Sequence, residues 1–285
     1  MVDIILAHEP AIRLSAFLGI LVVMAAWEAL ASRRPRRFSR WVRWPSNFGL
    51  VILNTMVLRL TVPITAVGVA ALAEQRGWGL LNSVGLAAWA RIAVALLVLD
   101  LVIYLQHVVF HAVPTLWRLH RMHHADLDFD VTTGARFHPV EILLSMGLKL
   151  AVVAALGAPP IAVLVFEVVL NATAMFNHGN VGLPPWFDGM LRWIIVTPDM
   201  HRVHHSVITH ETNSNFGFNL PWWDRLFGTY CAKPAAGQDG MTIGLDRFRD
   251  PGQLRLDRML IQPVVGPAGA YPLNRRSGPD GAGRS

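Results

Sequence analysis

The sequence predicts an all-α integral membrane protein, and three features lead to that fold class. Hydrophobic residues make up 53% of the 285 residues and charged residues only 15%, which is more apolar than an ordinary soluble enzyme. The apolar residues occur in runs close to the ~20 residues that cross ~30 Å of hydrocarbon. No alternating strand pattern stands out. We therefore expect a bundle of three spanning helices plus a helical hairpin, with a helical cap on the cytoplasmic side.

The expected membrane helices follow one another along the chain. A stretch from Glu141 to Phe176 is apolar but interrupted at Gly157-Ala158-Pro159-Pro160, which predicts the two arms of the hairpin. Tryptophans such as Trp41 and Trp89 flank apolar runs, as in an interfacial belt. Three single runs precede the hairpin: Leu14 to Ala31, Phe48 to Ala73 and Ala88 to Gln106.

Positive charge sets the expected orientation. The positive-inside rule places the arginines after the first span in the cytoplasm and the N-terminus outside. We assign most of the formal charge of +6 to this cluster and expect it to contact anionic lipid headgroups rather than nucleic acid. Asp3 and Glu9 precede the first run where a signal peptide would be basic, so we expect an anchor. The cluster comprises Arg33, Arg34, Arg36, Arg37, Arg40 and Arg43.

Histidines gather in three short windows, all on the expected cytoplasmic side. His107 and His111 form the first window. On a helix, positions i, i+3 and i+4 share a face, so each window directs its imidazoles toward one region. Neutral imidazole is a good ligand for iron, zinc, copper and nickel, which predicts a metal site. The other two windows share one pattern, 81 positions apart: His120-x-x-His123-His124 and His201-x-x-His204-His205.

Two more histidines join the candidate ligands. His178 follows the second hairpin arm, and His138 lies before Pro139, where a ligand role and a structural role both remain open. His8 and His210 have no cluster partner and are left out. A metal ion takes about four to six ligands, so these imidazoles predict two ions. The chain lacks His-Glu-x-x-His and has one cysteine, Cys231, which argues against zinc-protease, structural zinc and iron–sulfur sites and favours paired irons open to dioxygen.

Polar residues inside two of the apolar helices point toward the histidines. Ionisable groups at membrane depth usually face a protein interior, a partner or a cavity. We expect four such residues to line the cavity or contact the ligands, with helix–helix hydrogen bonds as the alternative. Arg59 in the second span is expected to pair with one of the two acids among them. The four residues are Asp100, Tyr104, Glu167 and Asn171.

Acids near the histidine windows are expected to orient the ligand imidazoles. A metal-bound imidazole usually donates its second N–H to a carboxylate or carbonyl, which holds the ring in place. The alternative is that these acids are simply solvated. The candidates are Asp126, Asp128, Asp130 and Asp199.

The order and spacing of these motifs resemble those of the fatty acid hydroxylase and sterol desaturase superfamily, over roughly Asp100 to Tyr230. Val108 is a departure, since many relatives carry Arg at that position. The resemblance implies a membrane-bound di-iron enzyme with a histidine-only ligand set. It rests on His107-x-x-x-His111, His120-Arg121-Met122-His123-His124, Arg136-Phe137-His138-Pro139, Asn177-His178-Gly179-Asn180, His201-Arg202-Val203-His204-His205 and Trp223-Asp224-Arg225-Leu226-Phe227-Gly228-Thr229.

The implied reaction is O2-dependent hydroxylation or desaturation of a lipid such as a fatty acyl chain or a sterol-like molecule. Cleavage of an ether lipid at the same metal site is the alternative. Breaking an unactivated C–H bond needs an oxidant that no side chain provides. The chain has no G-x-G-x-x-G after a strand and no flavin signature, so we expect no NAD or flavin site in it. Electrons must then come from a separate donor, of the ferredoxin or cytochrome b5 type.

Other function classes fit the pattern less well. A divalent-metal transporter should bind its ion near the bilayer midplane on broken helices, whereas these histidines gather at one end. A membrane haem protein needs only axial ligands, which the dense clusters exceed. A non-catalytic scaffold would not need every cluster intact. We expect three regions: residues 1–87 with two spans and the Arg-rich loop, 88–231 with the di-iron core, and 232–285 as a Gly/Pro-rich peripheral tail whose last fifteen or so residues are disordered.

Overall fold

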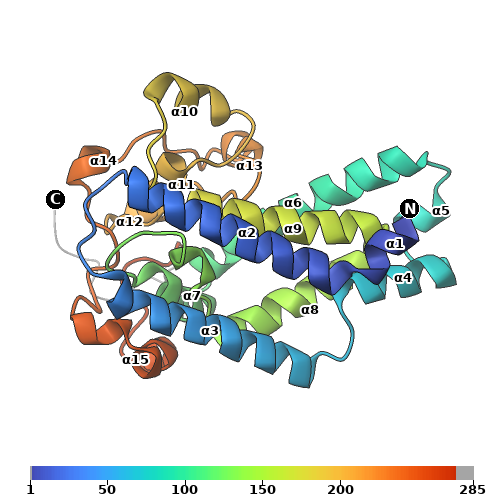
Figure 1. Cartoon of the computed structure of the whole chain (residues 1–285), viewed down its shortest axis with the longest axis horizontal. Coiled ribbons are helices and arrows are strands. Elements are labelled where there is room, and N and C mark those ends of the chain that lie inside the picture. Colours follow the sequence, from blue (N-terminus) through green and yellow to red (C-terminus); the bar gives the residue numbers. More distant parts are fainter. Residues whose placement is uncertain (1, 274–285) are drawn as a thin grey trace, which may run out of the picture.

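Long helices run side by side in the computed structural model, and short helices cover one end of the bundle (Figure 1). The structure describes residues 2–273. Within that range the regular elements are helices, and extended pairing is limited to two isolated bridges, Ser32 with Val181 and Ser206 with Ile243. The predicted all-α fold class is confirmed.

The protein is an integral membrane protein with five segments that are long and apolar enough to span a bilayer. Four are single helices: α2 (Glu9–Leu30), α6 (Ala88–Ala112), α8 (Pro139–Leu156) and α9 (Pro160–Asn177). The fifth, Arg40–Ser83, contains α3 (Arg40–Thr61), α4 (Ala66–Arg76) and α5 (Leu80–Ser83), and the short α1 (Val2–Ala7) precedes α2.

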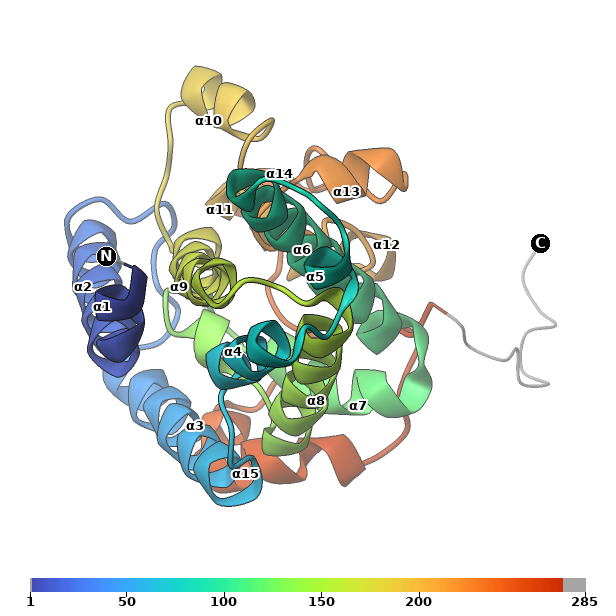
Figure 2. The same ribbon diagram turned by 90° about the vertical axis from the view of Figure 1, so that its right-hand side faces the viewer.

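The central span is α9, because 56% of its apolar window is buried whereas the other spans reach at most 28%. Figure 2 looks along the bundle and shows α9 between α2 and α6, with α4 beside α9 and α8 on the other side of α4. The hairpin of α8 and α9 was predicted at this place. Gly157 ends α8 in the left-handed conformation that glycine adopts without strain, and Pro160 begins α9.

The second expected span is divided in two. We predicted one helix from Phe48 to Ala73, but α3 ends at Thr61 and α4 begins at Ala66. Pro63 lies between them, and proline lacks the N–H that continues a helix and disfavours helical geometry in the residue before it. The long apolar run concealed this break.

Short helices of the cap follow α6 and α9. Pro114 ends α6 and occupies the first turn of α7, so the chain turns back and packs the two helices together. The cap consists of α7 (Pro114–His124), η1 (Thr133–Ala135), α10 (Pro185–Leu191), α11 (Pro198–His204), α12 (Thr209–Thr212), α13 (Trp222–Leu226), α14 (Gly237–Gly240), η2 (Pro251–Leu254), α15 (Leu256–Ile261) and η3 (Gln262–Val264).

Within the described residues, the segment after residue 231 (232–273) packs on the cap and is not peripheral to it. The Trp117 indole donates to the Ala268 carbonyl at 3.1 Å, and Leu273 N donates to the His111 carbonyl at 3.0 Å. Tyr271 is buried. Our expectation of disorder from about residue 271 is wrong for 271–273, and the remainder, 274–285, lies outside the described residues. Composition hid this packing because a few large side chains anchor a Gly/Pro-rich segment.

Candidate metal centre

Four helices bring nine of the ten predicted ligand histidines together at the cap end of the bundle. In each of two groups, the candidate ligand nitrogens lie within 4.8 Å of one another, and every member is buried. The first group is His107, His111, His120, His124 and His204; the second is His123, His178, His201 and His205.

Each His-x-x-His-His triplet contributes to both groups. In α7, His120 and His124 join the first group while His123 joins the second. In the second triplet the middle histidine, His204, joins the first group, and His201 and His205 join the second. Positions i and i+4 lie about 40° apart around a helix, whereas i+3 lies on the other side of i. Each triplet is therefore suited to link two adjacent ions, and rings of the two groups touch, as at His124 and His205 with 4.6 Å between centroids.

Hydrogen bonds fix the orientation of several rings. His107 Nδ1 donates to the Phe216 carbonyl at 2.8 Å, and His204 Nδ1 donates to the Ser214 carbonyl at 2.7 Å. His178 Nδ1 donates to the Ala174 carbonyl at 2.7 Å. A carbonyl only accepts, so the proton of each neutral ring lies on Nδ1 and the Nε2 lone pair is free.

Two further imidazoles are oriented by hydrogen bonds to side chains. His120 Nδ1 donates to Glu141 Oε1 at 2.7 Å, and His111 Nδ1 donates to Asn213 Oδ1 at 3.0 Å. The Asn213 amide is itself oriented, since its Nδ2 donates to the Tyr271 carbonyl at 2.7 Å. His107 and His120 thus direct two unprotonated Nε2 atoms at each other across 3.1 Å.

For His107 and His120 this arrangement is unfavourable unless a cation lies between the two lone pairs, and other Nε2 atoms converge at similar distances. Nε2 of His111 and His124 are 3.1 Å apart, and His178 Nε2 is 3.1 Å from His201 Nε2 and 3.2 Å from His123 Nε2. Two nitrogen ligands on one ion, each at about 2.1 Å and at right angles, lie about 3 Å apart. The donor set therefore fits a transition-metal ion in each group.

Burial keeps these imidazoles neutral. It lowers the pKa of His120 and of His178 from 6.5 to about 3. Burial, followed by the neighbouring imidazoles, also lowers the pKa of His123, His124 and His205 well below 6.5. A neutral imidazole is the form that binds a metal.

His138 lies outside both groups. Its Nδ1 accepts from Val140 N at 3.2 Å, which caps the first turn of α8, and its Nε2 donates to the Leu260 carbonyl at 3.3 Å. Of the two roles that the sequence left open, the structural one describes these contacts.

The four acids expected to orient imidazoles pair with other groups in the described residues. Arg43, wholly buried, donates to Asp126 at 2.6 Å and to Asp130 at 2.5 Å. Asp128 accepts from the backbone of Arg37, and Asp199 pairs with arginines. The expectation is wrong because guanidinium groups bind three of these carboxylates more strongly than a neutral imidazole would, and backbone N–H groups bind Asp128.

The Arg43 network holds the loop that follows α7. Burial alone would raise the pKa of Asp126, but the Arg136 and Arg43 guanidinium groups outweigh it and lower the pKa to about 2. Thr133 Oγ1 adds a bond to Asp126 at 2.9 Å. Arg43 therefore binds internal carboxylates instead of lipid headgroups, which corrects our assignment for this member of the arginine cluster.

The predicted polar residues of the spans have different surroundings. Asp100 accepts from the Trp223 indole at 2.7 Å, and the Tyr104 hydroxyl bonds Thr229 at 2.9 Å. Glu167 is buried but pairs with Arg13 at 2.9 Å and Lys149 at 2.7 Å.

Two expectations about the spans are wrong. Asn171 is exposed and donates to the Glu167 carbonyl of its own helix, so it does not line the site. Arg59 is also exposed and pairs with neither Asp100 nor Glu167. Both side chains lie on outward faces that spacing alone did not reveal.

Sequence reasoning missed Glu141, Asn213 and Asp224. Asp224 accepts from Phe216 N and Gly217 N at 2.8 Å each, which positions the carbonyl that orients His107. Burial raises the pKa of Asp224 to about 6. Glu141 had a signal, since it is an acid at the start of an apolar run. Asp224 stands in the Trp-Asp-Arg-Leu-Phe-Gly-Thr motif, whereas Asn213 had no such signal.

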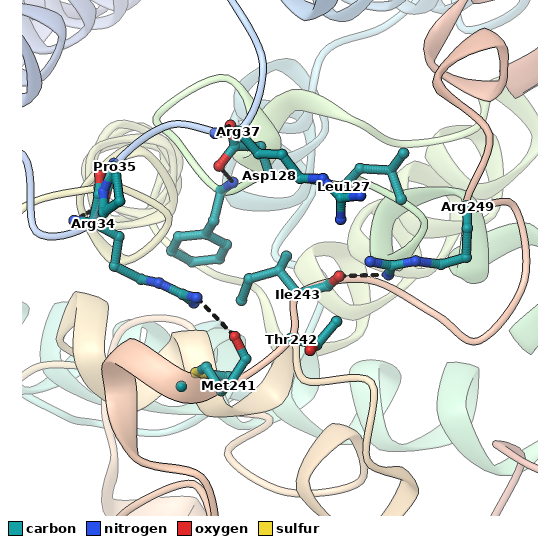
Figure 3. A pocket seen from close by; sticks show the side chains of 12 residues that line it. Arg34, Pro35, Arg37, Leu127, Asp128, Met241, Thr242, Ile243 and Arg249 are labelled. Atoms are coloured by element: carbon teal, nitrogen blue, oxygen red, sulfur yellow. Dashed lines mark hydrogen bonds between the residues drawn. The ribbon is translucent and has the colours of Figure 1, made fainter.

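A separate pocket of about 290 Å³ lies among the segment between α2 and α3, the loop after α7 and the residues after α14 (Figure 3). Arg34, Arg37 and Arg249 line it, and none of the grouped histidines does. Its wall includes Phe129, whose ring stacks on His178 with 5.6 Å between centroids. The pocket therefore adjoins the second histidine group without being the metal site.

Known proteins share this histidine-bearing part of the chain. The model of the family described as "Fatty acid hydroxylase" matches residues 92–229. Ornithine lipid hydroxylase OlsE of Rhizobium tropici is 33% identical over 144 residues, which cover 50% of this chain and 43% of that protein. No solved structure matches.

Two more distant relatives match similar lengths. Alkylglycerol monooxygenase of Xenopus tropicalis is 27% identical over 165 residues, covering 55% of this chain and 34% of that protein. Cholesterol 25-hydroxylase of Rattus norvegicus is 26% identical over 174 residues, covering 58% of this chain and 54% of that protein. The chain thus spans about a third to a half of the length of these relatives. The matched segment contains both histidine groups, and over residues 92–229 this chain is similar to the fatty acid hydroxylase family.

Proposed function

We propose that this chain is a membrane-bound non-haem di-iron oxygenase that uses dioxygen to hydroxylate a lipid. The observation that carries the proposal is the convergence of buried imidazole Nε2 atoms, 3.1 Å apart in pairs, in two adjacent groups. Five and four imidazoles leave open positions on two ions that prefer about six ligands. Two irons would supply the dioxygen activation that no side chain provides.

The proposed ligands are the nine grouped histidines, with His138 outside the set. The protein holds them neutral by burial, and Nδ1 bonds orient five of the rings, which leaves Nε2 of those five for the metals. Glu141 and Asn213 orient two of the rings. The groups lie at one end of the spans, which differs from the midplane site of a transporter.

The overall reaction balances with an external reductant. One oxygen atom enters the substrate C–H bond, the other leaves as water, and two electrons and two protons are consumed. We propose a separate electron donor of the ferredoxin or cytochrome b5 type, because the sequence has no nucleotide-binding or flavin motif. A lipid substrate agrees with the spans and with relatives whose names specify ornithine lipid, alkylglycerol and cholesterol.

Ether-lipid cleavage is the second candidate, favoured by the match to alkylglycerol monooxygenase. Hydroxylation next to an ether oxygen forms a hemiacetal that collapses to an aldehyde and an alcohol. The same metal groups would serve both outcomes, and the bound carbon decides between them.

We test the proposal by measuring metal content and lipid products. Purified protein should hold about two irons per chain, and cells expressing it under labelled dioxygen should accumulate lipids that carry one labelled oxygen atom. A chain with His123 and His204 both replaced by alanine should do neither. Released fatty aldehyde would favour ether cleavage. If the purified protein contained zinc and no iron, or if the oxygen atom of the product came from water, the oxygenase assignment would be contradicted.

We further propose that the histidine groups lie on the cytoplasmic side and that the segment before α2 lies outside. The Arg-rich segment between α2 and α3 supports this orientation, and it contacts the cap, since Arg34 donates to the Met241 carbonyl at 2.7 Å. Cysteines at Asp239 and Gly85, in a Cys231→Ser chain, should be labelled from opposite sides of sealed membranes. Labelling of both from one side would refute the orientation.

A further inference from the structure

An apolar surface stands out from the side of the bundle at the cap end. Figures 1 and 2 both show α10 beyond α9, away from the bundle axis. Six large apolar side chains of α10, the residues after it and α13 are between 52% and 69% exposed. We call these six the lateral face: Trp186, Met190, Trp193, Ile194, Leu226 and Phe227.

No exposed charge interrupts the lateral face in its first segment, residues 183–195. The two charged residues there, Asp188 and Arg192, are buried and pair with each other at 2.6 Å. An apolar surface this rich in tryptophan is unusual for a water-exposed cap and typical of a membrane interface. By contrast α15, elsewhere on the cap, exposes Asp257 and Arg258.

The contacts of α13 place it at membrane depth. Trp223 donates to Asp100, the thirteenth of the 25 residues of α6, at 2.7 Å. At about 1.5 Å per residue, Asp100 lies about 18 Å from either end of a helix that spans about 30 Å of hydrocarbon. A helix that contacts the middle of a span from its outer side cannot lie in the aqueous phase.

The rest of the lateral face is joined to α13. The Trp222 indole donates to the Trp193 carbonyl at 2.6 Å, and the Arg225 guanidinium stacks on the Trp193 ring at 3.8 Å. The segment after α10 therefore lies beside α13 and shares its environment.

We propose that the lateral face is embedded in the lipid bilayer on the histidine side, as a membrane-inserted part of the cap. Its apolar surface then continues the lipid-facing surface of α6, on which Leu97, Leu105 and Val109 are exposed. The aqueous surface of the cap is limited to its other sides.

Embedding brings bilayer lipid close to the metal centre. The Phe227 ring stacks on the Tyr104 ring with 5.5 Å between centroids. The centroid of the Phe216 ring lies 6.4 Å from that of Tyr104 and 5.4 Å from that of His107. A lipid at Phe227 is thus separated from the first histidine group by a short series of rings. This step rests on the proposed function, and it makes the junction of α6 and α13 the side from which a lipid substrate enters.

Spin labels in nanodiscs test the embedding without requiring iron or activity. Single cysteines replace Met190 or Leu226 in a Cys231→Ser chain, with Leu97→Cys in α6 as the lipid control and Asp239→Cys in α14 as the aqueous control. Relaxation by molecular oxygen, which partitions into the bilayer, is compared with relaxation by a water-soluble nickel chelate. Thermal midpoints confirm that each labelled chain is folded.

The labels at Met190 and Leu226 should match Leu97, with strong relaxation by oxygen and weak relaxation by nickel. Nickel relaxation equal to that at Asp239 would overturn the proposal, because the face would then be aqueous. Weak relaxation by both agents would also overturn it, since a second protein surface would cover the face.

A separate variant tests lipid entry. Leu226→Glu should raise KM for the lipid severalfold while iron content and kcat stay unchanged. An unchanged KM would refute entry at this junction. Absence of any lipid product from the unmodified chain would instead count against the proposed function, and the spin-label result would stand independently.

Discussion

Replacing Glu141 by glutamine should weaken iron binding while leaving the hairpin folded. Glu141 Oε1 accepts the Nδ1 proton of His120 at 2.7 Å, and both side chains are at most 4% exposed. The carboxylate holds this proton on Nδ1 and makes Nε2 a stronger donor to a metal. Glutamine keeps the shape and one acceptor oxygen but cannot carry a carboxylate charge opposite a metal-bound imidazole.

The expected loss is tenfold to a hundredfold in iron affinity, or about 1.4–2.8 kcal/mol. Two features of the structure favour the upper half of that range. The pair is buried, so water does not replace the altered bond, and Glu141 Oε2 has no hydrogen-bond partner among the described residues that would help to orient the ring. The loss is not larger, because four other imidazoles of the first group still hold the ion.

Competition with a chelator, followed by measurement of the iron retained, gives the affinity. The matched control is Glu167→Gln, which removes a buried carboxylate from the other arm of the hairpin. Glu167 pairs with Arg13 and Lys149 and with no histidine, so its loss should leave iron affinity unchanged. Equal affinities in wild type and Glu141→Gln, or equal losses in the two variants, would refute the reasoning.

Three further predictions follow from burial and pairing. Arg43→Met removes the guanidinium that pairs with two buried carboxylates and leaves Asp126 only its longer ion pair with Arg136, so it should cost about 3–5 kcal/mol of unfolding free energy. The exposed pair lost in Arg255→Met should cost less than about 1 kcal/mol, and equal thermal midpoints of the two variants in detergent would contradict this. His204→Ala should abolish lipid hydroxylation and lower iron content, whereas His210→Ala, outside both groups, should change neither. Iron loss from both variants would contradict the assignment of ligands to the two groups. Burial raises the pKa of Asp224 from 3.8 to about 6, so the protonated side chain stabilises the fold fully below pH 3.8 and this stabilisation is lost as pH rises through 6. Thermal melts should show wild type losing about 3 kcal/mol of unfolding free energy relative to Asp224→Asn over that range. Parallel pH profiles of the two chains would contradict this prediction.

Sequence patterns predicted what depends on neighbours along the chain. Run length and hydropathy predicted the spans, and Gly157 with the prolines after it predicted the hairpin, because both properties act within a few turns of helix. The spacing of each His-x-x-His-His triplet indicated a shared helix face. The break at Pro63 was also visible in principle, but the apolar residues around it dominated the pattern.

The composition of the metal centre was less accessible to sequence reasoning. Three of the bonds that orient imidazoles go to backbone carbonyls, those of Ala174, Ser214 and Phe216, and every residue has a carbonyl whatever its side chain. The acids nearest the histidines in sequence proved to bind Arg43, other arginines or backbone N–H groups. Proximity along the chain did not identify the partners, because long-range packing brought stronger competitors to those carboxylates.

By itself, the sequence determined that this chain is a helical membrane protein with enough clustered histidines for two metal ions, since helix period, apolar length and ligand type are local properties. Only the tertiary structure decided which imidazoles share an ion, that His138 caps a helix, and that α13 reaches the middle of α6. These outcomes depend on where distant segments meet in space. The packing of α6, α7, α9 and α11 sets those positions, and no single segment encodes them.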